Sequence, residues 1–230
     1  MSLVYLIRHG QAGSRDDYDR LSDIGQRQAA LLGQYLCGWG VRFTAAYCGA
    51  LQRQRQTAEL ALGALPGAPE LRIDPRWNEF DLEGLWRILA PRLMAEDQEF
   101  ARNYELLHRN NPRIDRTMTV CDTELIRTWM RGSHSLNGLE SWMDFRSRVE
   151  QTSSTLAAHG PDEVVVVFTS ATPIATWSSM AFDRDPRSVF RIVGVLLNSS
   201  FSTFSVNQDV RLLSLNNAPH LVDASLRTLR

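Results

Sequence analysis

The sequence contains no lysine, because all 25 of its basic residues are arginine. This absence excludes chemistry that depends on a lysine amine: Schiff-base formation, the P-loop NTPases and the protein kinases. Any side chain that binds an anion through its positive charge must therefore be an arginine or a histidine. The base composition of the genome is a sufficient explanation for the missing lysine, so the absence limits the chemistry without identifying it.

Cysteine is also scarce, and its spacing indicates neither a disulfide framework nor a metal site. The three cysteines, Cys37, Cys48 and Cys121, are odd in number and lack the spacing of metal ligands. They indicate reduced thiols, so we expect a cytoplasmic protein. No other cluster has ligand spacing, and we expect neither a metal ion nor any other cofactor.

Long apolar runs and a dominant charge are missing as well. No run approaches the roughly 18 apolar residues of a membrane span, and the first apolar run stops at Arg8, so we expect no secretory signal. The formal net charge of −1 gives no basic field for nucleic acid or an anionic membrane. We therefore expect neither as a partner; the sequence leaves the oligomeric state open.

Short apolar strands alternate with amphipathic helices along the chain. This alternation is typical of an α/β fold with three layers, in which helices cover both faces of a mainly parallel sheet. The length of 230 residues suits one domain over residues 1–230. Strands are predicted over 3–7, 43–47, 163–168, 201–206 and 211–215, and helices from Ser22, over 51–62, over 141–158 and from Pro173.

Residues 85–135 interrupt this alternation. Apolar spacing predicts a helix over 85–108, a break at Asn110-Asn111-Pro112 and a second helix over 121–130. We interpret 85–135 as a helical insertion, or cap, within the domain. The alternative is a helical elaboration that packs on the domain and contacts no ligand.

The first candidate site follows the first strand, where Arg8-His9-Gly10 comes directly after residues 3–7. In open α/β sheets, ligands bind at the carboxyl ends of the strands. A histidine there can act as a nucleophile, and an arginine can hold an anion in a fixed fork geometry. Taken alone, the tripeptide fits a structural histidine at a strand end equally well.

Further segments decide between these interpretations. Together with Arg8-His9-Gly10, they resemble the histidine phosphatase superfamily, which is also called the phosphoglycerate mutase-like family. The resemblance spans about residues 3–221 and implies the phosphoglycerate mutase-like fold. Its segments are Leu21-Ser22-Asp23-Ile24-Gly25-Gln26-Arg27-Gln28-Ala29, Leu51-Gln52-Arg53-Gln54-Arg55-Gln56-Thr57-Ala58, Asn78-Glu79-Phe80-Asp81, residues 138–149 and residues 164–173.

The resemblance implies hydrolysis of a phosphomonoester in two steps. His9 would attack phosphorus and carry the phosphoryl group as phosphohistidine. Glu79 would give a proton to the leaving oxygen and then activate water. Glu83 lies four residues further on and is a rival acid, but the Asn-Glu-Phe context favours Glu79 over a solvated Glu83.

The resemblance also implies a phosphate-binding set. Arg8 and Arg53 would donate to the phosphoryl oxygens, and the start of the helix at Arg53 would add backbone amides. The neighbouring Arg55 does not occupy the family position, so we expect it on the surface.

The chain departs from the family at the second histidine. Ser170 stands where the family usually has a histidine, within Thr169-Ser170-Ala171-Thr172. Serine can still contribute a hydrogen bond to the phosphate, but it lacks the charge and the reach. We expect Thr172 and Pro173 to be the N-cap and first residue of a helix that points its amino end at the phosphate.

Four other histidines are candidates to take the place of the family's second histidine. We expect His159 and His220 to be structural, whereas His108 and His134 lie in or beside residues 85–135 and could point inward.

These observations leave two classes of function open. The first is a phosphatase that acts on a small phosphorylated metabolite or a phosphoprotein. The second is a phospho-ligand-binding or interaction protein on the same fold, catalytically weakened by the change at Ser170. The presence of Arg8, His9, Arg53 and Glu79 favours the enzyme. A phosphoglycerate mutase is less favoured, because the start of 85–135 has no dense basic cluster for a bisphosphate.

Overall fold

The computed structural model describes residues 1–14, 17–108, 114–182 and 189–229, without the side chains of 108 and 114–119. It consists of two compact units. The first combines residues 1–79 with 148–230, and the second comprises residues 80–147. The segment 85–135, predicted as an insertion, lies within the second unit.

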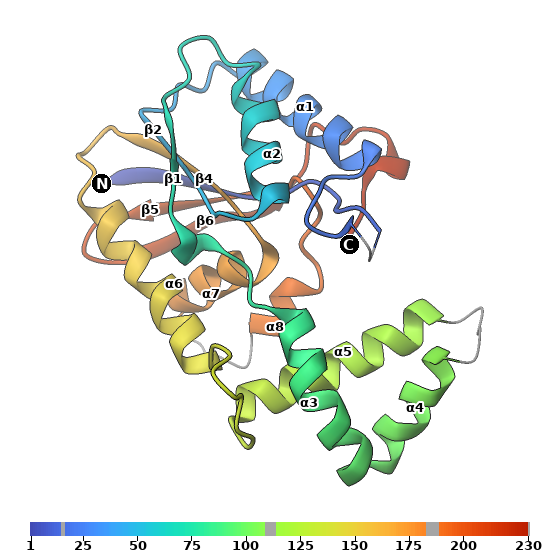
Figure 1. Ribbon diagram of the computed structural model, residues 1–230. Coiled ribbons are helices and arrows are strands. Elements are labelled where there is room, and N and C mark those ends of the chain that lie inside the picture. Colours follow the sequence, from blue (N-terminus) through green and yellow to red (C-terminus); the bar gives the residue numbers. More distant parts are fainter. Residues whose placement is uncertain (15–16, 109–113, 183–188, 230) are drawn as a thin grey trace. The chain divides into compact units, whose positions relative to one another are not determined.

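One mixed sheet forms the centre of the first unit (Figure 1). Its strand order over the described residues is β3-β2-β4-β1-β5-β6. The first four strands are parallel to one another, and β5 and β6 continue the sheet in antiparallel fashion. The predicted α/β class is confirmed; β3, which is short and mostly exposed, was not predicted. The strands are β1 (Ser2–Arg8), β2 (Ala45–Cys48), β3 (Leu71–Ile73), β4 (Val164–Thr169), β5 (Phe201–Val206) and β6 (Val210–Asn217).

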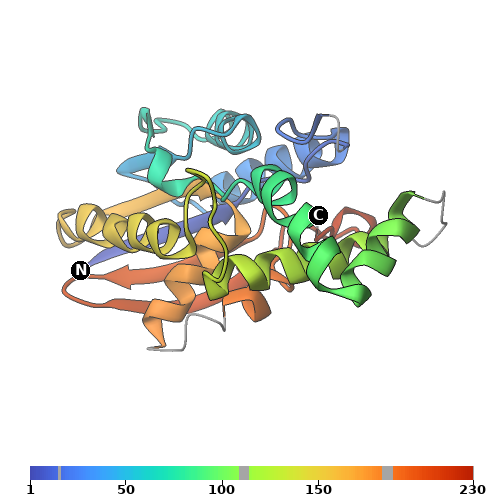
Figure 2. The ribbon, with the colours of Figure 1, turned by 60° about the horizontal axis from the view of Figure 1, so that its bottom comes forward.

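Helices cover both faces of this sheet (Figure 2). On one face lie α1 (Asp23–Gly38) and α2 (Gln52–Leu62). On the other lie α6 (Trp142–Ala157), which begins in the second unit, and α7 (Ala171–Ala181). The short helix α8 (Val189–Val193) follows α7, and two short 3-10 helices span Pro75–Trp77 and Ala224–Leu226.

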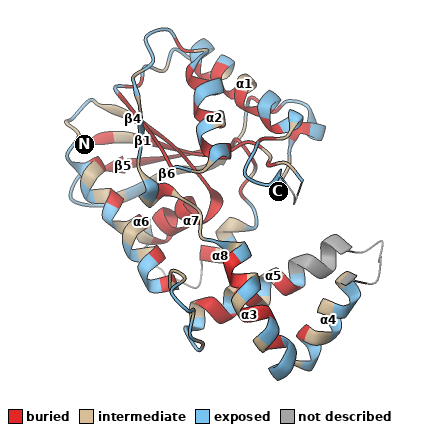
Figure 3. Ribbon diagram, viewed as in Figure 1, coloured by how far each residue is buried: buried red, intermediate tan, exposed pale blue. Residues whose placement is uncertain are grey.

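The core follows the alternation of side chains along the strands. Ile7 of β1 and Phe168 of β4 pack against Leu32 and Leu36 of α1. Their neighbours in sequence point to the opposite face, because successive strand residues alternate. There the ring of Trp177 lies 5.6 Å from that of Phe204. The central strands are therefore buried on both sides, as Figure 3 shows.

The start of α1 is fixed by a side-chain cap and by a close backbone approach. Ser22 is the N-cap, as predicted, and its Oγ accepts a hydrogen bond of 3.0 Å from the backbone N–H of Gly25. The backbones of Gly10 and Gly25 come so close that a Cβ on Gly10 would collide with the Gly25 carbonyl. The loop after β1 is thereby held against the first turn of α1.

The second unit is helical and contains α3 (Leu82–Glu96), α4 (Gln98–His108) and α5 (Ile114–Arg131). The helix predicted over 85–108 is interrupted at Asp97, whose carboxylate accepts hydrogen bonds from the backbone N–H groups of Glu99 and Phe100. The break predicted at 110–112 lies outside the described residues. Four aromatic rings pack together in this unit: Phe80, Trp129, Trp142 and Phe145.

None of the helices in the described ranges combines the length and apolar character that crossing a membrane requires.

The close approach at Gly10 makes a prediction about stability. Gly10→Ala should lower the free energy of unfolding by about 1–3 kcal/mol, because the added methyl forces two backbone segments apart. The matched control is Gly38→Ala at the end of α1, where an added Cβ meets no atom within 4 Å. Gly38→Ala should be neutral or stabilise the protein by up to about 1 kcal/mol. Urea unfolding of both variants measures the difference; equal effects would contradict this account of Gly10.

Candidate active site

The carboxyl ends of three parallel strands meet at one edge of the sheet. The backbone N–H of His9, directly after β1, donates to the carbonyl of Thr169 at the end of β4 (2.9 Å). The N–H of Gly49, directly after β2, donates to the carbonyl of Phe168 (3.1 Å). These bonds bring His9, Ser170 and the loop that leads into α2 to the same edge, where α/β sheets bind ligands.

His9 is held as a neutral imidazole in one tautomer. Its Nδ1 lies 2.7 Å from the carbonyl oxygen of Gly10, so Nδ1 carries the proton and Nε2 presents its lone pair. Burial, and then the charges of Arg53 and Arg8, lower the pKa of His9 well below its ordinary value, although the bond to Gly10 partly opposes them. Neutral imidazole with an unprotonated Nε2 is the form that a nucleophile requires.

Arg53 lies directly beside this nitrogen. It is the second residue of α2, and its guanidinium is buried. Its Nε donates to His9 Nε2 at 3.2 Å, and its Nη1 lies 2.8 Å from an oxygen of Asp19. The ring of Tyr18 covers it, with 5.0 Å between the ring centre and Cζ. Arg55, two residues further on, is exposed, as predicted.

The predictions did not include Tyr18 or Asp19. Their segment carries no feature of its own beyond a cluster of charges, and only the fold places it over α2.

Arg8 is buried beside the site, but much of its donor fork is engaged with the main chain. Its Nη1 donates to the carbonyl of Leu196, and its Nη2 donates to that of Leu229 at 2.8 Å. Its Nε has no hydrogen-bond partner among the described residues. Burial lowers the pKa of Arg8, whereas Tyr18 and Glu79 raise it, so Glu79 lies within electrostatic range. Arg8 thus supplies charge and an Nε–H without a partner among the described residues, whereas the sequence predicted a two-pronged grip on the anion.

Glu79 lies against the amino end of α7. The backbone N–H of Thr172 donates to its Oε2 at 3.1 Å. The predicted cap at this helix was wrong: the N-cap is Ser170 and the helix begins at Ala171, which makes Pro173 its third residue. Proline is tolerated there because the N–H groups of a first helical turn have no partner within the helix. At least one of the amides expected to face phosphate therefore serves Glu79.

Ser170 is buried and has a protein partner. Its Oγ accepts a hydrogen bond of 2.8 Å from Nε2 of Gln54, which also donates to the carbonyl of Trp77 (3.0 Å). Gln54 therefore joins α2, the end of β4 and the segment that leads to Glu79. Gln54 was not predicted, because it lies at a position where the resemblance specifies no residue type.

The other candidates lie elsewhere. His159 Nε2 lies 3.0 Å from the hydroxyl of Tyr47, and His220 lies 2.8 Å from that of Ser199, consistent with structural roles. Burial lowers the pKa of His220 to about 4. In the second unit His134 pairs with a glutamate and Glu83 is exposed, whereas the side chain of His108 lies outside the described residues.

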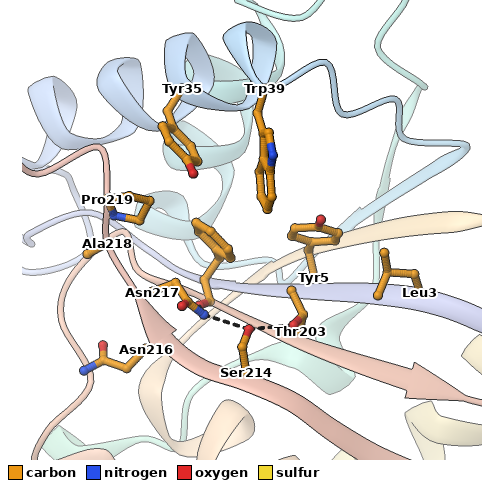
Figure 4. Close-up of a pocket in the computed structure, with 11 residues that line it drawn as sticks. Leu3, Tyr5, Tyr35, Trp39, Thr203, Ser214, Asn216, Asn217, Ala218 and Pro219 are labelled. Atoms are coloured by element: carbon orange, nitrogen blue, oxygen red, sulfur yellow. Dashed lines mark hydrogen bonds between the residues drawn. The ribbon is translucent and has the colours of Figure 1, made fainter.

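A hollow of about 660 Å³ lies beside α1 (Figure 4). None of its lining residues is charged, so it lacks the charged donors that suit a phosphate dianion. The edge at His9, in contrast, has the buried guanidinium groups of Arg8 and Arg53. The hollow is lined by Leu3, Tyr5, Tyr35, Trp39, Phe201, Thr203, Ser214 and residues 216–219.

No group of three or more residues of the types that ligate metals occurs within the described ranges.

Comparison with solved structures establishes the class of fold. The phosphoserine phosphatase of Entamoeba histolytica, in complex with phosphoserine, has a TM-score of 0.64 at 18% identity, over 96% of this chain and 100% of that chain. The alpha-ribazole phosphatase of Shigella flexneri has a TM-score of 0.63 at 22% identity, over 94% of this chain and 96% of that chain. This is the phosphoglycerate mutase-like fold, in agreement with the prediction.

Comparison of sequences points to one family. A model of the histidine phosphatase superfamily, branch 1, matches residues 4–113, just under half of the chain. The mitochondrial serine/threonine-protein phosphatase Pgam5 of Caenorhabditis elegans is 28% identical over 134 residues, which cover 54% of this chain and 47% of that protein. The chain thus spans about half the length of the curated relatives it matches. Over residues 4–113 it is similar to the histidine phosphatase superfamily, and the proteins it resembles in sequence or fold include phosphatases.

The burial of His9 predicts how it titrates. Because its folded pKa lies below the unfolded value of about 6.5, protonation favours unfolding. The stability contributed by neutral His9 is fully present above about pH 6.5 and is lost progressively at lower pH.

Imidazole nitrogen NMR, assigned with His9→Ala, should show the neutral Nδ1–H tautomer at pH 6. Arg53→Gln should restore only part of the ordinary pKa of His9, since burial is the larger cause of the lowered pKa. Protonation of His9 near pH 6.5 in the folded wild type would contradict this electrostatic account.

The bond between Ser170 and Gln54 predicts a mild effect of removing the hydroxyl. Ser170→Ala should lower kcat/KM by about tenfold or less, because a neutral hydrogen bond contributes about 0.5–1.5 kcal/mol. Ser170→His should not raise it, since Ser170 and Thr172 are buried and a larger ring would have to displace their neighbours. The matched control is Ser178→Ala, a buried hydroxyl on α7 that bonds the Ile174 carbonyl. A thousandfold loss in Ser170→Ala alone would show a direct catalytic role.

Proposed function

We propose that this protein is a phosphomonoester hydrolase that works through a phosphohistidine on His9. One observation carries the proposal: the proton of His9 is on Nδ1, and its Nε2 lies 3.2 Å from the buried guanidinium of Arg53. The proposed nucleophile and a cationic donor are therefore in direct contact. Phosphoryl transfer to a histidine requires both groups, because the negative charge on the phosphoryl oxygens must be balanced where the new P–N bond forms.

The first step transfers the phosphoryl group to the enzyme. A phosphoryl oxygen takes the place of His9 Nε2 as acceptor for Arg53, which frees the lone pair. Nε2 then attacks phosphorus in line, the P–O bond to the ester oxygen breaks, and Glu79 gives the leaving oxygen a proton. Gly10 holds the proton on Nδ1, so the ring attacks through Nε2.

The second step returns the enzyme to its starting state. Glu79, now a carboxylate, takes a proton from water as the water oxygen attacks phosphorus and the P–N bond breaks. Phosphate leaves, His9 is neutral again and Glu79 is protonated again. In both steps Arg53 and the charge of Arg8 stabilise the phosphoryl oxygens.

For the substrate, we propose a small phosphorylated metabolite or a phosphoprotein. The curated relatives support the second class, since their names describe serine/threonine-protein phosphatases. The phosphoserine complex of the fold neighbour supports phosphoserine as a first small probe.

A binding protein on the same fold is the second candidate, and one observation favours it. Ser170 is neutral, buried and engaged with Gln54, so this corner of the site offers no cationic donor to a phosphoryl group. A charge-assisted hydrogen bond contributes about 1.5–3 kcal/mol against about 1 for a neutral one. The phosphoryl group would then bind while turnover stays slow. A phosphoglycerate mutase remains the least favoured activity.

The enzyme is tested with a panel of phosphomonoesters that includes phosphoserine and a phosphoserine peptide. Wild type should release phosphate, and His9→Ala should lose at least a thousandfold in kcat/KM. Rapid quench should trap an acid-labile, base-stable label on His9.

Arg55→Ala is the matched control for Arg53→Ala, and only Arg53→Ala should lower activity. Good turnover without a label on His9 would rule out the mechanism. Phosphate-ester binding without turnover would support the binding protein instead.

A further inference from the structure

The guanidinium of Arg53 already binds a negatively charged side chain of the protein itself. Asp19 Oδ1 accepts a hydrogen bond of 2.8 Å from Nη1 of Arg53. Its Oδ2 accepts one of 3.1 Å from the backbone N–H of Gln52, the first residue of α2. A guanidinium and a first-turn amide of a helix are the donors that bind phosphoryl oxygens. A carboxylate thus occupies two donors that a substrate phosphate would use.

The two partners of this ion pair differ sharply in burial. The side chain of Asp19 is 51% exposed, whereas that of Arg53 is 7% exposed. Because Asp19 is half-exposed, water can solvate its carboxylate once it leaves, whereas the buried charge of Arg53 needs another anion in its place. A phosphate dianion carries more charge and three terminal oxygens. It therefore competes well for the same donors, and the departing Asp19 carboxylate is solvated by water.

We propose that Asp19 is an internal substitute for the substrate phosphate, which binds Arg53 and Gln52 in the resting protein and is displaced when a phosphate ester binds. The inference rests on the proposed function and deepens it, because Asp19 sets the affinity of that site for phosphate. Asp19 makes and breaks no covalent bond. It balances the buried charge of Arg53 between substrates, and its own negative charge opposes the incoming dianion.

The test measures binding of inorganic phosphate directly, by calorimetry or ³¹P NMR at fixed ionic strength, so it does not depend on turnover. Asp19→Asn removes the charge but keeps a side chain of the same size. Asp17→Asn is the matched control: Asp17 lies on the same segment, is equally charged and exposed, and pairs with Arg20 at 3.9 Å. Asp19→Asn should lower the Kd for phosphate by about two- to fivefold. Asp17→Asn should change it by less than twofold.

Steady-state kinetics separate displacement from a positioning role. If Asp19 is displaced by substrate, Asp19→Asn lowers KM and leaves kcat within about twofold of wild type. If Asp19 instead orients Arg53 for the reaction, the same variant lowers kcat, and the proposal is wrong.

The remaining outcomes are equally decisive. Unchanged or weaker phosphate binding by Asp19→Asn, equal tightening by Asp17→Asn, or no phosphate binding by any form overturns the proposal. Tighter binding by Asp19→Asn alone, without turnover in any form, supports the proposal while the proposed hydrolysis fails.

Discussion

The hydrogen bond from Arg53 Nε to His9 Nε2 is the interaction on which the rest of the site depends. It places a full positive charge against an imidazole in a buried environment, where a second positive charge would be costly. The histidine must therefore stay neutral, and its proton must lie on Nδ1, where Gly10 accepts it. Burial, which is the larger cause of the lowered pKa, and the bond to Gly10 act with this contact to keep His9 neutral with its proton on Nδ1.

The surrounding fold holds both partners of this contact with main-chain and buried hydrogen bonds. Thr57 of α2 accepts a bond of 3.0 Å from the N–H of Gly10 and donates one of 2.7 Å to the carbonyl of Arg53. Gln28 of α1 accepts from Gln11 and donates to Leu226, which ties the loop after His9 to the end of the chain. The strands therefore position His9, and the helices position the Arg53 guanidinium against it.

Much of the fold could be predicted because its signals are local. Apolar runs marked the central strands, and Ser22 marked the start of α1. The strand β3 escaped prediction because it is three residues long and gains its place only by pairing with β2. The start of α7 was misplaced, because a proline can occupy any position of a first helical turn, and the sequence alone does not say which.

The candidate site could be predicted as a set of residues but not as a set of contacts. Motifs named Arg8, His9, Arg53, Glu79 and Ser170, yet no sequence pattern indicated that Arg8 donates to the carbonyls of Leu196 and Leu229. The roles of Asp19 and Gln54 depend on segments that the fold alone brings together, 34 and 116 residues away from their partners.

The central proposal is that phosphorus binds where His9 Nε2 and the Arg53 guanidinium meet. A crystal structure with orthovanadate, which mimics the five-coordinate phosphoryl group, tests this claim most directly. The account predicts vanadium bonded to His9 Nε2, with the Arg53 guanidinium on its equatorial oxygens and Asp19 displaced. Vanadate bound elsewhere, with the Arg53–His9 hydrogen bond intact, would contradict it.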